Sequence, residues 1–285
     1  MAPPVVAAVL SFPPPMIPEL FRIGDFAISP FGVMMVAAFL ASYFHLLWGF
    51  RRLGIGGEDD ASAIIFAAGV GGIVGSKVYY AILYGDWRLL LDRAGLVWYG
   101  GFILATLLVL WVMRRRRLPF ASTLDVAMSG VPLGYALGRV GCFLVGDDYG
   151  MPTDQPWGVV FPHGLPRTTA GNLRAEFGAD IPASVPFDQL MPVHPTQLYE
   201  TLAGFTIWFV GISMLRRRAR PGATALVCLA LLAVERFLVE FLRAKDDRFF
   251  GGLTLAQVIS LITLAVAFAI WMRWRRRGRS AEEAA

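Results

Sequence analysis

Seven long apolar segments are the feature that most constrains how this chain folds. They cover residues 30–50, 61–84, 96–113, 122–146, 196–215, 223–243 and 254–272. A helix needs roughly 20 apolar residues to cross a bilayer, and these segments lack the polar–apolar alternation of a membrane barrel. Only 16% of the 285 residues are charged, whereas a soluble domain carries about a quarter. We therefore predict an all-α integral membrane protein, with residues 1–285 forming a single transmembrane domain of seven spanning helices.

The connections between these segments differ in charge, which predicts their orientation. Fifteen of the 26 Lys and Arg residues lie within 51–52, 114–117, 216–220 and 273–279. Because Lys and Arg concentrate in cytoplasmic loops, these connections are expected to face the cytoplasm. The N-terminus is then periplasmic, the C-terminus is cytoplasmic, and the long connection 147–195 forms an extracytoplasmic cap. Topology thus explains the basic residues without a nucleic-acid partner.

Four basic residues fall inside the predicted spans, where a charge costs about 2.5–3.5 kcal/mol at the helix centre: Lys77, Arg139, Arg236 and Arg243. Lys77, Arg139 and Arg236 each precede the predicted outer end of their segment by seven residues. At 1.5 Å per residue, all three are expected roughly 10 Å below the outer surface. Three acidic residues, Glu200, Glu235 and Glu240, share this layer, and Glu240 lies one helical turn beyond Arg236.

Two interpretations of these charges are open. Lys77 could extend its amine outward to the membrane surface, with Arg236 merely paired to Glu240. We favour a basic pocket for an anionic phospholipid head group, because guanidinium groups bind phosphate oxygens bidentately. The bilayer would then hold the acyl chains of the bound lipid.

Glycines recur every fourth residue beside these charges. They are Gly130, Gly134 and Gly138 in the fourth segment, and Gly71 and Gly75 in the second. This spacing is typical of closely packed membrane helices. It predicts that Arg139 points into the helix bundle.

No sequence pattern predicts a cofactor. The spacing of Cys, His, Asp and Glu matches no metal site, and no phosphate-binding or dinucleotide-binding glycine pattern is present. Cys142 and Cys228 both lie in predicted spans, so we expect free thiols. The expected cofactor and metal content is therefore none.

Residues 138–150 read GRVGCFLVGDDYG, and residues 194–200 read HPTQLYE. These two motifs resemble the signature GRxGNFxNxExxG and the HPSQLYE motif of the bacterial prolipoprotein diacylglyceryl transferases. The segments RFLVEFLR at 236–243 and GLTLAQ at 252–257 are similar to the family's RFxVExxR and GxTxxQ. WYGG at 98–101 and ISPFG at 28–32 match two further motifs in part. The likeness extends from about residue 20 to about residue 270.

The resemblance implies transfer of a diacylglyceryl group from phosphatidylglycerol to the lipobox cysteine of a preprolipoprotein signal peptide. This would be the first step of bacterial lipoprotein maturation, in the inner membrane, with the active site toward the periplasmic leaflet. It implies that Arg139 holds the lipid phosphate and that Arg236, oriented by Glu240, supports it. The remaining residues within these motifs are Tyr99 and Asp147 as expected catalytic groups, and His194, Glu200 and Cys142 in substrate binding. Lys77 is expected in substrate binding from its depth in the membrane.

The chain departs from the family pattern at positions that bear on proton transfer. Tyr99 replaces a histidine, Cys142 an asparagine and Asp147 a glutamate. A phenol donates hydrogen bonds but is a poor base near pH 7. Asp147, His194 or a lowered thiol pKa are the open alternatives for deprotonating the substrate thiol. Two other functions remain open: an altered relative that binds anionic lipid or prolipoprotein without transfer, and a lipid or anion transporter.

Overall fold

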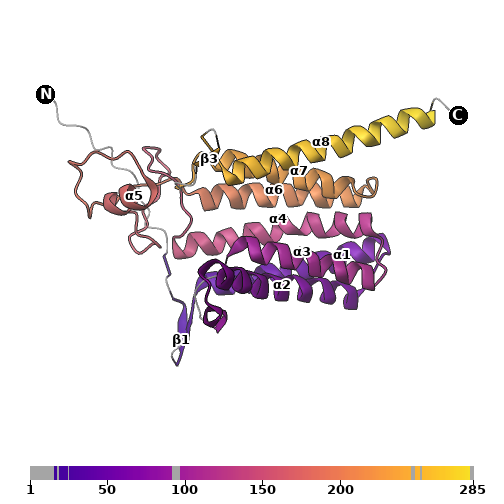
Figure 1. Ribbon diagram of the computed structural model, residues 1–285, viewed down its shortest axis with the longest axis horizontal. Helices are drawn as coiled ribbons and strands as arrows, with labels where there is room; N and C mark the ends of the chain where they lie inside the picture. The colour runs from indigo at the N-terminus through magenta and orange to yellow at the C-terminus, as the bar shows by residue number, and fades with distance from the viewer. Residues whose placement is uncertain are drawn as a thin grey trace. The chain divides into compact units, whose positions relative to one another are not determined.

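Helices account for most of the chain in the computed structural model (Figure 1), which describes residues 16–17, 19–24, 26–91, 97–244, 248–250 and 252–282. The first four helices are α1 (Pro30–Leu53), α2 (Glu58–Tyr84), α3 (Trp98–Arg115) and α4 (Phe120–Val145), with a 3-10 helix at Trp87–Leu91. The remaining helices are α5 (Ala170–Phe177), α6 (Thr196–Arg216), α7 (Ala223–Val239) and α8 (Leu255–Glu282). Two short antiparallel pairs complete the fold: β1 (Phe21–Ile23) with β2 (Phe26–Ile28), and β3 (Arg248–Phe250) with β4 (Leu253–Thr254).

Each of the seven apolar segments forms a helix, and five of these helices are long and apolar enough to cross a membrane. These five are α1, α2, α4, α6 and the Leu255–Arg276 part of α8. The other two, α3 and α7, are shorter, with 18 and 17 residues. The chain is therefore a multi-pass helical membrane protein.

Helix α7 ends earlier than the sequence predicts. It stops at Val239, whereas the apolar segment was expected to continue to residue 243. Arg236 therefore lies three residues before the helix end, not seven. The chain leaves the helix and turns at residues 240–242. Across this turn Glu240 and Arg243 form a buried ion pair with each other.

The helices divide into two compact units. The first contains residues 1–38, 132–210 and 226–285, and the second contains residues 39–131 and 211–225. The boundaries between the units fall within α1, α4, α6 and α7.

Close packing of α2 against α3 dominates the second unit. A Cβ atom added at Gly75 would collide with the carbonyl oxygen of Gly100, and one added at Gly71 would meet the backbone of Ala105. Only glycine lets the two helix backbones approach this closely. The structure thus confirms that these glycines form a packing face.

A buried carboxylate fixes the start of α7 within the second unit. The two oxygens of Asp125, on α4, accept hydrogen bonds from the backbone N–H groups of Gly222 and Ala225, each at 2.7 Å. The first N–H groups of a helix have no intrahelical acceptor, so Asp125 satisfies two of them. The helix dipole adds to this stabilisation, because its positive end faces the carboxylate.

In the first unit, α4 and α6 approach each other closely. A Cβ atom at Gly204 would lie 2.9 Å from the carbonyl oxygen of Pro132 and 3.0 Å from the Ala136 Cβ. The Thr201 hydroxyl lies 3.4 Å from the Ala136 carbonyl oxygen. This contact brings Arg139, about one turn beyond Ala136, beside the first turns of α6.

The segment between α4 and α6, residues 147–195, is ordered around a small hydrophobic core of its own. Thr169 caps the start of helix α5, because its side chain accepts the N–H of Asn172, and Gly178, with φ +61°, caps the helix end. The buried core residues are Tyr149, Phe161, Ala170, Leu173, Ala179, Ile181 and Val193, together with Ala244 beyond the segment. We call this segment the cap.

Candidate functional site

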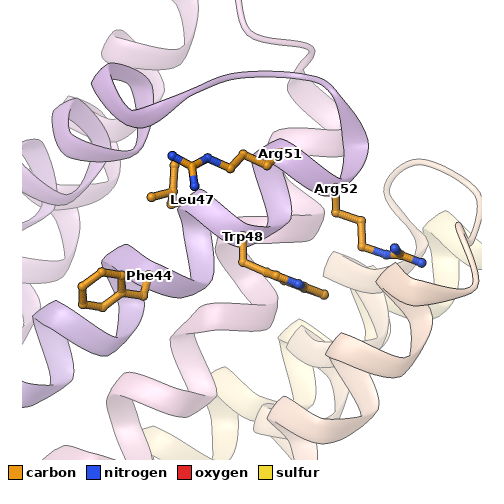
Figure 2. A pocket seen from close by; sticks show the side chains of 5 residues that line it. All are labelled: Phe44, Leu47, Trp48, Arg51 and Arg52. Atoms are coloured by element: carbon orange, nitrogen blue, oxygen red, sulfur yellow. The ribbon is translucent and has the colours of Figure 1, made fainter.

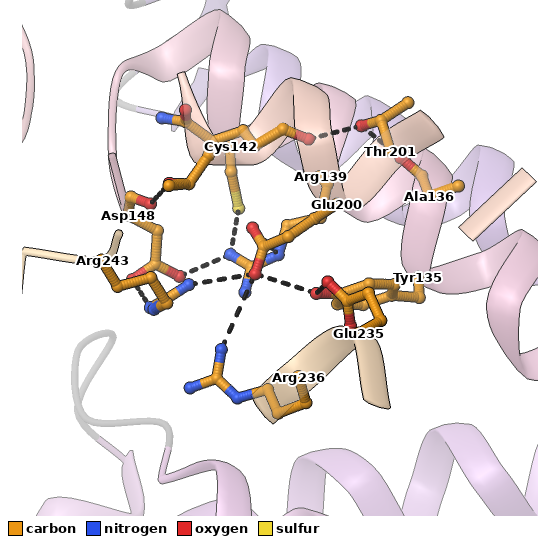
Figure 3. A network of polar contacts seen from close by, with 12 residues as sticks. Tyr135, Ala136, Arg139, Cys142, Asp148, Glu200, Thr201, Glu235, Arg236 and Arg243 are labelled. Carbon is orange, nitrogen blue, oxygen red and sulfur yellow. Dashed lines mark hydrogen bonds and ion pairs between the residues drawn. The ribbon is translucent and has the colours of Figure 1, made fainter. Parts of the chain in front are cut away.

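A fully buried carboxylate, Glu200 on α6, forms the centre of the candidate site (Figure 3). Its oxygens accept a hydrogen bond from the Tyr135 hydroxyl at 2.9 Å and pair with the Arg139 Nε at 3.0 Å. Two further guanidinium groups contact it, Arg243 through Nη1 at 3.3 Å and Arg236 through Nη1 at 3.7 Å. Arg139 and Arg236, which the sequence predicts to converge, therefore meet at one carboxylate.

Two other carboxylates complete the ionic network around the three arginines. Asp148 bridges two of them, with Oδ2 2.7 Å from Arg139 Nη1 and Oδ1 2.7 Å from Arg243 Nη2. Glu240 lies 2.5 Å from Arg236 Nη2 and 3.7 Å from Arg243 Nε. We call Arg139, Arg236, Arg243, Asp148, Glu200 and Glu240 the arginine–carboxylate cluster.

The loop that follows α4 places Asp148 in the cluster. Gly146 and Asp148 both have left-handed backbone conformations, with φ of +71° and +55°, and Asp is among the residues that tolerate this region. The first turn of α6 fixes the loop backbone. Thr196 donates its hydroxyl to the Asp148 carbonyl at 3.0 Å, and Gln197 donates its amide to the Asp147 carbonyl at 2.6 Å.

Arg243 is held by a close approach between the end of α7 and the cap. Its backbone forms an antiparallel bridge with Gly150. A Cβ atom at Gly150 would collide with the Leu242 carbonyl oxygen and lie 2.8 Å from the His194 Cβ. This explains why glycine ends the 138–150 motif: its backbone must pass directly between these two segments.

The cluster is balanced in charge, which differs from the basic pocket expected from the sequence. Three guanidinium groups are matched by the carboxylates of Glu200, Glu240 and Asp148. Buried charges require such pairing, because desolvating an unpaired ion is costly. The side chains differ in accessibility: Arg243 is 3% exposed and Arg139 13%, whereas Arg236 is 28% and Asp148 40% exposed.

Among the other residues predicted for the site, Asp147 and Cys142 adjoin the cluster. The Cys142 Sγ is 3.8 Å from Arg139 Nη1 and is buried. Asp147 directly precedes Asp148, the residue that forms ion pairs with Arg139 and Arg243. Burial raises the pKa of the Asp147 carboxyl above its usual range.

His194 belongs to a second polar network, at the start of α6. Its Nδ1 lies 3.3 Å from the Tyr199 hydroxyl, which accepts a hydrogen bond from Trp157 Nε1 at 2.7 Å. Burial lowers the pKa of His194 below its ordinary value of 6.5, so its imidazole is neutral at pH 7. A neutral imidazole can accept a proton.

Lys77 and Tyr99 belong to the second unit. Lys77 lies on α2, and Tyr99 lies in the first turn of α3, where its ring packs edge-on against Trp98. Their membership of the site stays a prediction from the sequence.

Sequence reasoning gave no site role to Asp148 or Tyr135. It placed Arg243 inside a predicted span and Glu235 beside Arg236, without a role for either. Tyr135 precedes Arg139 by one helical turn, its ring lies 5.3 Å from the Arg139 guanidinium, and its hydroxyl is 3.4 Å from Glu235. Its position four residues before Arg139, on the same helix face, is the signal that predicts Tyr135 beside this arginine. Asp148 and Arg243 lie outside helices, and no periodic pattern predicts their direction.

A separate hollow of about 490 Å³ lies in the second unit, along α1 (Figure 2). Phe44, Leu47, Trp48, Arg51 and Arg52 line it. Aromatic residues beside arginines at a helix end are typical of a membrane interface. The described residues contain no group of three His, Cys, Asp or Glu side chains placed to hold a metal ion.

Together, the fold and the site define a multi-pass helical membrane protein with an arginine–carboxylate cluster buried among its helices. Intramembrane charges of this kind mark functional sites by default. The family model "Prolipoprotein diacylglyceryl transferase" matches residues 18–273 of the chain. The chain belongs to the prolipoprotein diacylglyceryl transferase family.

Named relatives are similar over nearly their whole lengths. The chain is 32% identical over 283 residues to the phosphatidylglycerol–prolipoprotein diacylglyceryl transferase of Xylella fastidiosa strain 9a5c, covering 90% of this chain and 93% of the relative. Proteins of the same name from Geobacter sulfurreducens and Vibrio cholerae O395 are each 28% identical. The matches cover 92% and 89% of this chain, and 97% and 90% of the respective relatives.

Proposed function

We propose that this protein transfers the diacylglyceryl group of phosphatidylglycerol to the lipobox cysteine thiol of a preprolipoprotein. The observation that carries the proposal is the convergence of Arg139, Arg236 and Arg243 on Glu200, in a chain of this family. The transfer joins a cysteine sulfur to a lipid carbon and releases glycerol phosphate. Positioned arginines stabilise the charge that develops on such a leaving group.

The proposed reaction is a substitution at the glycerol carbon that carries the phosphate. The cysteine sulfur attacks this carbon, a C–S bond forms, and the C–O bond to the phosphate breaks. The bonding electrons pass to the departing glycerol phosphate, and the thiol loses its proton. The nucleophile belongs to the substrate peptide, so the reaction requires neither Cys142 nor Cys228.

Arg139 and Arg236 are proposed phosphate-binding groups, with Arg243 beside them in the same cluster. Glu200 and Glu240 orient them, because each guanidinium is tied to a buried carboxylate and presents its nitrogens in a fixed direction. Arg236 is the most exposed of the three cluster arginines and is therefore the first that an incoming lipid would meet. We retain Lys77 and Cys142 as proposed substrate contacts and Tyr99 as a proposed catalytic hydrogen-bond donor.

Two groups are proposed as proton acceptors for the thiol: Asp147, which adjoins the cluster, and His194, in the second polar network. Burial raises the pKa of Asp147, which makes this carboxylate a stronger base than an exposed one. His194, whose pKa is lowered by burial, is neutral at pH 7 and is the second candidate. The nearby arginines favour the thiolate electrostatically, so a weak base suffices.

The membrane arrangement is also a proposal. All seven long helices would span the bacterial inner membrane, with the N-terminus and the cap in the periplasm and the C-terminus in the cytoplasm. Helices α3 and α7 have 18 and 17 residues, within the range of roughly 17–25 for a span. The Arg and Lys distribution between the connections supports this orientation.

Reconstitution tests the function directly. The purified protein is placed in vesicles with phosphatidylglycerol and a synthetic peptide containing a lipobox cysteine. We expect a mass increase on that cysteine equal to one diacylglyceryl group, and release of glycerol phosphate. Lipid or peptide binding without modification would instead support an altered relative that binds its ligands without transfer.

Substitution of Arg139 tests its role. Arg139→Ala should abolish peptide modification, with a loss of at least about 100-fold, comparable to removal of one transition-state hydrogen-bond donor. Membrane insertion should persist, as measured by yield and by the circular dichroism of the purified variant. Full activity in Arg139→Ala would remove this arginine from the mechanism.

A further inference from the structure

One carboxylate of the cluster differs from the others in origin and accessibility. Glu200 and Glu240 lie in or directly after helices, and their side chains are 0% and 1% exposed. Asp148 lies in the loop after α4, and its side chain is 40% exposed. It is therefore the carboxylate that a group entering the cluster could replace.

The backbone and the side chain of Asp148 are held by different partners. Thr196 holds its carbonyl oxygen, whereas its carboxylate is held by Arg139 and Arg243. Rotation about the side-chain bonds could move the carboxylate out of the cluster while the loop stays in place. That rotation breaks the ion pairs with both arginines, unless another anion takes over the two guanidinium groups.

A phosphodiester fits the position that the carboxylate occupies. Asp148 offers one negative charge through two oxygens, each 2.7 Å from a different guanidinium. The phosphodiester of an anionic phospholipid also offers one negative charge through two non-bridging oxygens. Exchanging one for the other leaves both arginines paired and the cluster balanced, which avoids the cost of an unpaired buried charge.

We propose that Asp148 is an internal competitor for the lipid phosphate: its carboxylate bridges Arg139 and Arg243 until the phosphodiester of an anionic phospholipid displaces it. Asp148 thereby sets the affinity for the lipid substrate without taking part in the chemical step. The identity of the lipid rests on the proposed function. The exchange itself rests on the geometry of the two arginines.

Neutral variants test the competition. In Asp148→Asn the side chain keeps its size but loses its charge, so its hydrogen bonds to the arginines weaken to those of a neutral acceptor. We expect the KM for phosphatidylglycerol, and its Kd in nanodiscs, to fall by about tenfold, with kcat changed by less than about threefold. Asp148→Ser should act in the same direction.

A matched control separates this effect from a general change of surface charge. Asp154→Asn removes one negative charge from an exposed position of the same cap. It should leave the KM for phosphatidylglycerol within about twofold of the wild type, because a single exposed charge interacts weakly with its surroundings. A similar fall in KM for both variants would overturn the proposal, and so would an unchanged or raised KM in Asp148→Asn.

A measurement on the wild-type protein keeps the proposal testable if the variants do not fold. Phosphatidylglycerol should increase carbodiimide labelling of the Asp148 carboxylate, read by mass spectrometry of its peptide, whereas phosphatidylcholine should not. Free glycerol phosphate, added without lipid, distinguishes binding of any phosphate from binding of a membrane lipid. Labelling that stays constant at saturating phosphatidylglycerol would contradict displacement.

The outcomes distinguish this inference from the proposed function. If the wild type transfers no lipid to the peptide but Asp148→Asn binds phosphatidylglycerol more tightly, the transferase proposal fails and the competition stands. If transfer proceeds normally and the KM does not change, only the competition fails.

Discussion

Replacing Glu200 with glutamine tests whether the cluster stabilises the fold. The change removes a negative charge from a side chain with no exposed surface but keeps its size, and the amide oxygen can still accept the Tyr135 hydroxyl. Arg139 and Arg243 would each lose one carboxylate and retain Asp148. The substitution is therefore a weakening of paired charges, not the creation of an isolated one.

The magnitude follows from the contacts that are lost. The two shortest ion pairs of Glu200 are those with Arg139 at 3.0 Å and Arg243 at 3.3 Å. Hydrogen bonds to charged groups contribute about 1.5–3 kcal/mol each. The glutamine amide oxygen still accepts hydrogen bonds from the arginines, so part of that interaction energy is kept. Burying a neutral amide also costs less free energy than burying a carboxylate. We therefore expect the free energy of unfolding to fall by about 3 kcal/mol, the lower end of the range for breaking a buried pair.

Equilibrium unfolding in mixed micelles, followed by tryptophan fluorescence and circular dichroism as the denaturing detergent fraction rises, measures this loss. Glu235→Gln is the matched control, because it makes the same chemical change at the carboxylate that lies 3.4 Å from the Tyr135 hydroxyl. The control should lose less than about 1 kcal/mol. A Glu200→Gln variant as stable as the wild type, or more stable, would refute the reasoning and show that desolvating Glu200 outweighs its ion pairs.

Three further predictions concern packing, capping and pH. Gly75→Ala should lower the free energy of unfolding by about 1–3 kcal/mol, because the added Cβ would collide with Gly100. Gly72→Ala adds its Cβ in open space and should leave the stability unchanged. Thermal unfolding of both variants measures the difference. Asp125→Ala should lower the free energy of unfolding by about 1–2 kcal/mol, because it leaves the start of α7 uncapped. Unfolding in a denaturing detergent measures this loss, and the KM for the lipid should not change. Burial lowers the folded-state pKa of His194 below 6.5, so the unfolded chain takes up the proton first and stability should decline as the pH falls below 6.5. His194→Gln should remove part of that decline between pH 7.5 and pH 5.5, and an unchanged pH profile would exclude His194 as its source.

Charge balance in the cluster bears on how a phosphate could bind. Three arginines already face three carboxylates, so an added phosphate leaves one negative charge in excess. Either a carboxylate leaves or a proton enters, because an unpaired buried charge is costly. The exposure of Asp148 makes its departure the simpler route, which links the affinity for lipid to one loop residue.

The sequence by itself determined the helices of this protein. Length and apolar composition predict all seven long helices, because a bilayer admits backbone only when its hydrogen bonds are satisfied within the segment. The glycine spacing predicts the close approach at Gly75, since small residues at i and i+4 occupy one helix face. The position of Arg139, Arg236 and Glu240 inside apolar segments also predicts that these charged side chains have partners in the fold.

Only the tertiary structure decided which partners those charges take. Asp147 and Asp148 are adjacent and chemically identical, yet the left-handed turn at Asp148 directs its carboxylate to Arg139 and Arg243. Arg243 reaches the cluster because α7 ends at Val239, which its apolar sequence did not indicate. Ion pairs between residues that are far apart in the sequence depend on backbone turns and side-chain directions, which local periodicity does not determine.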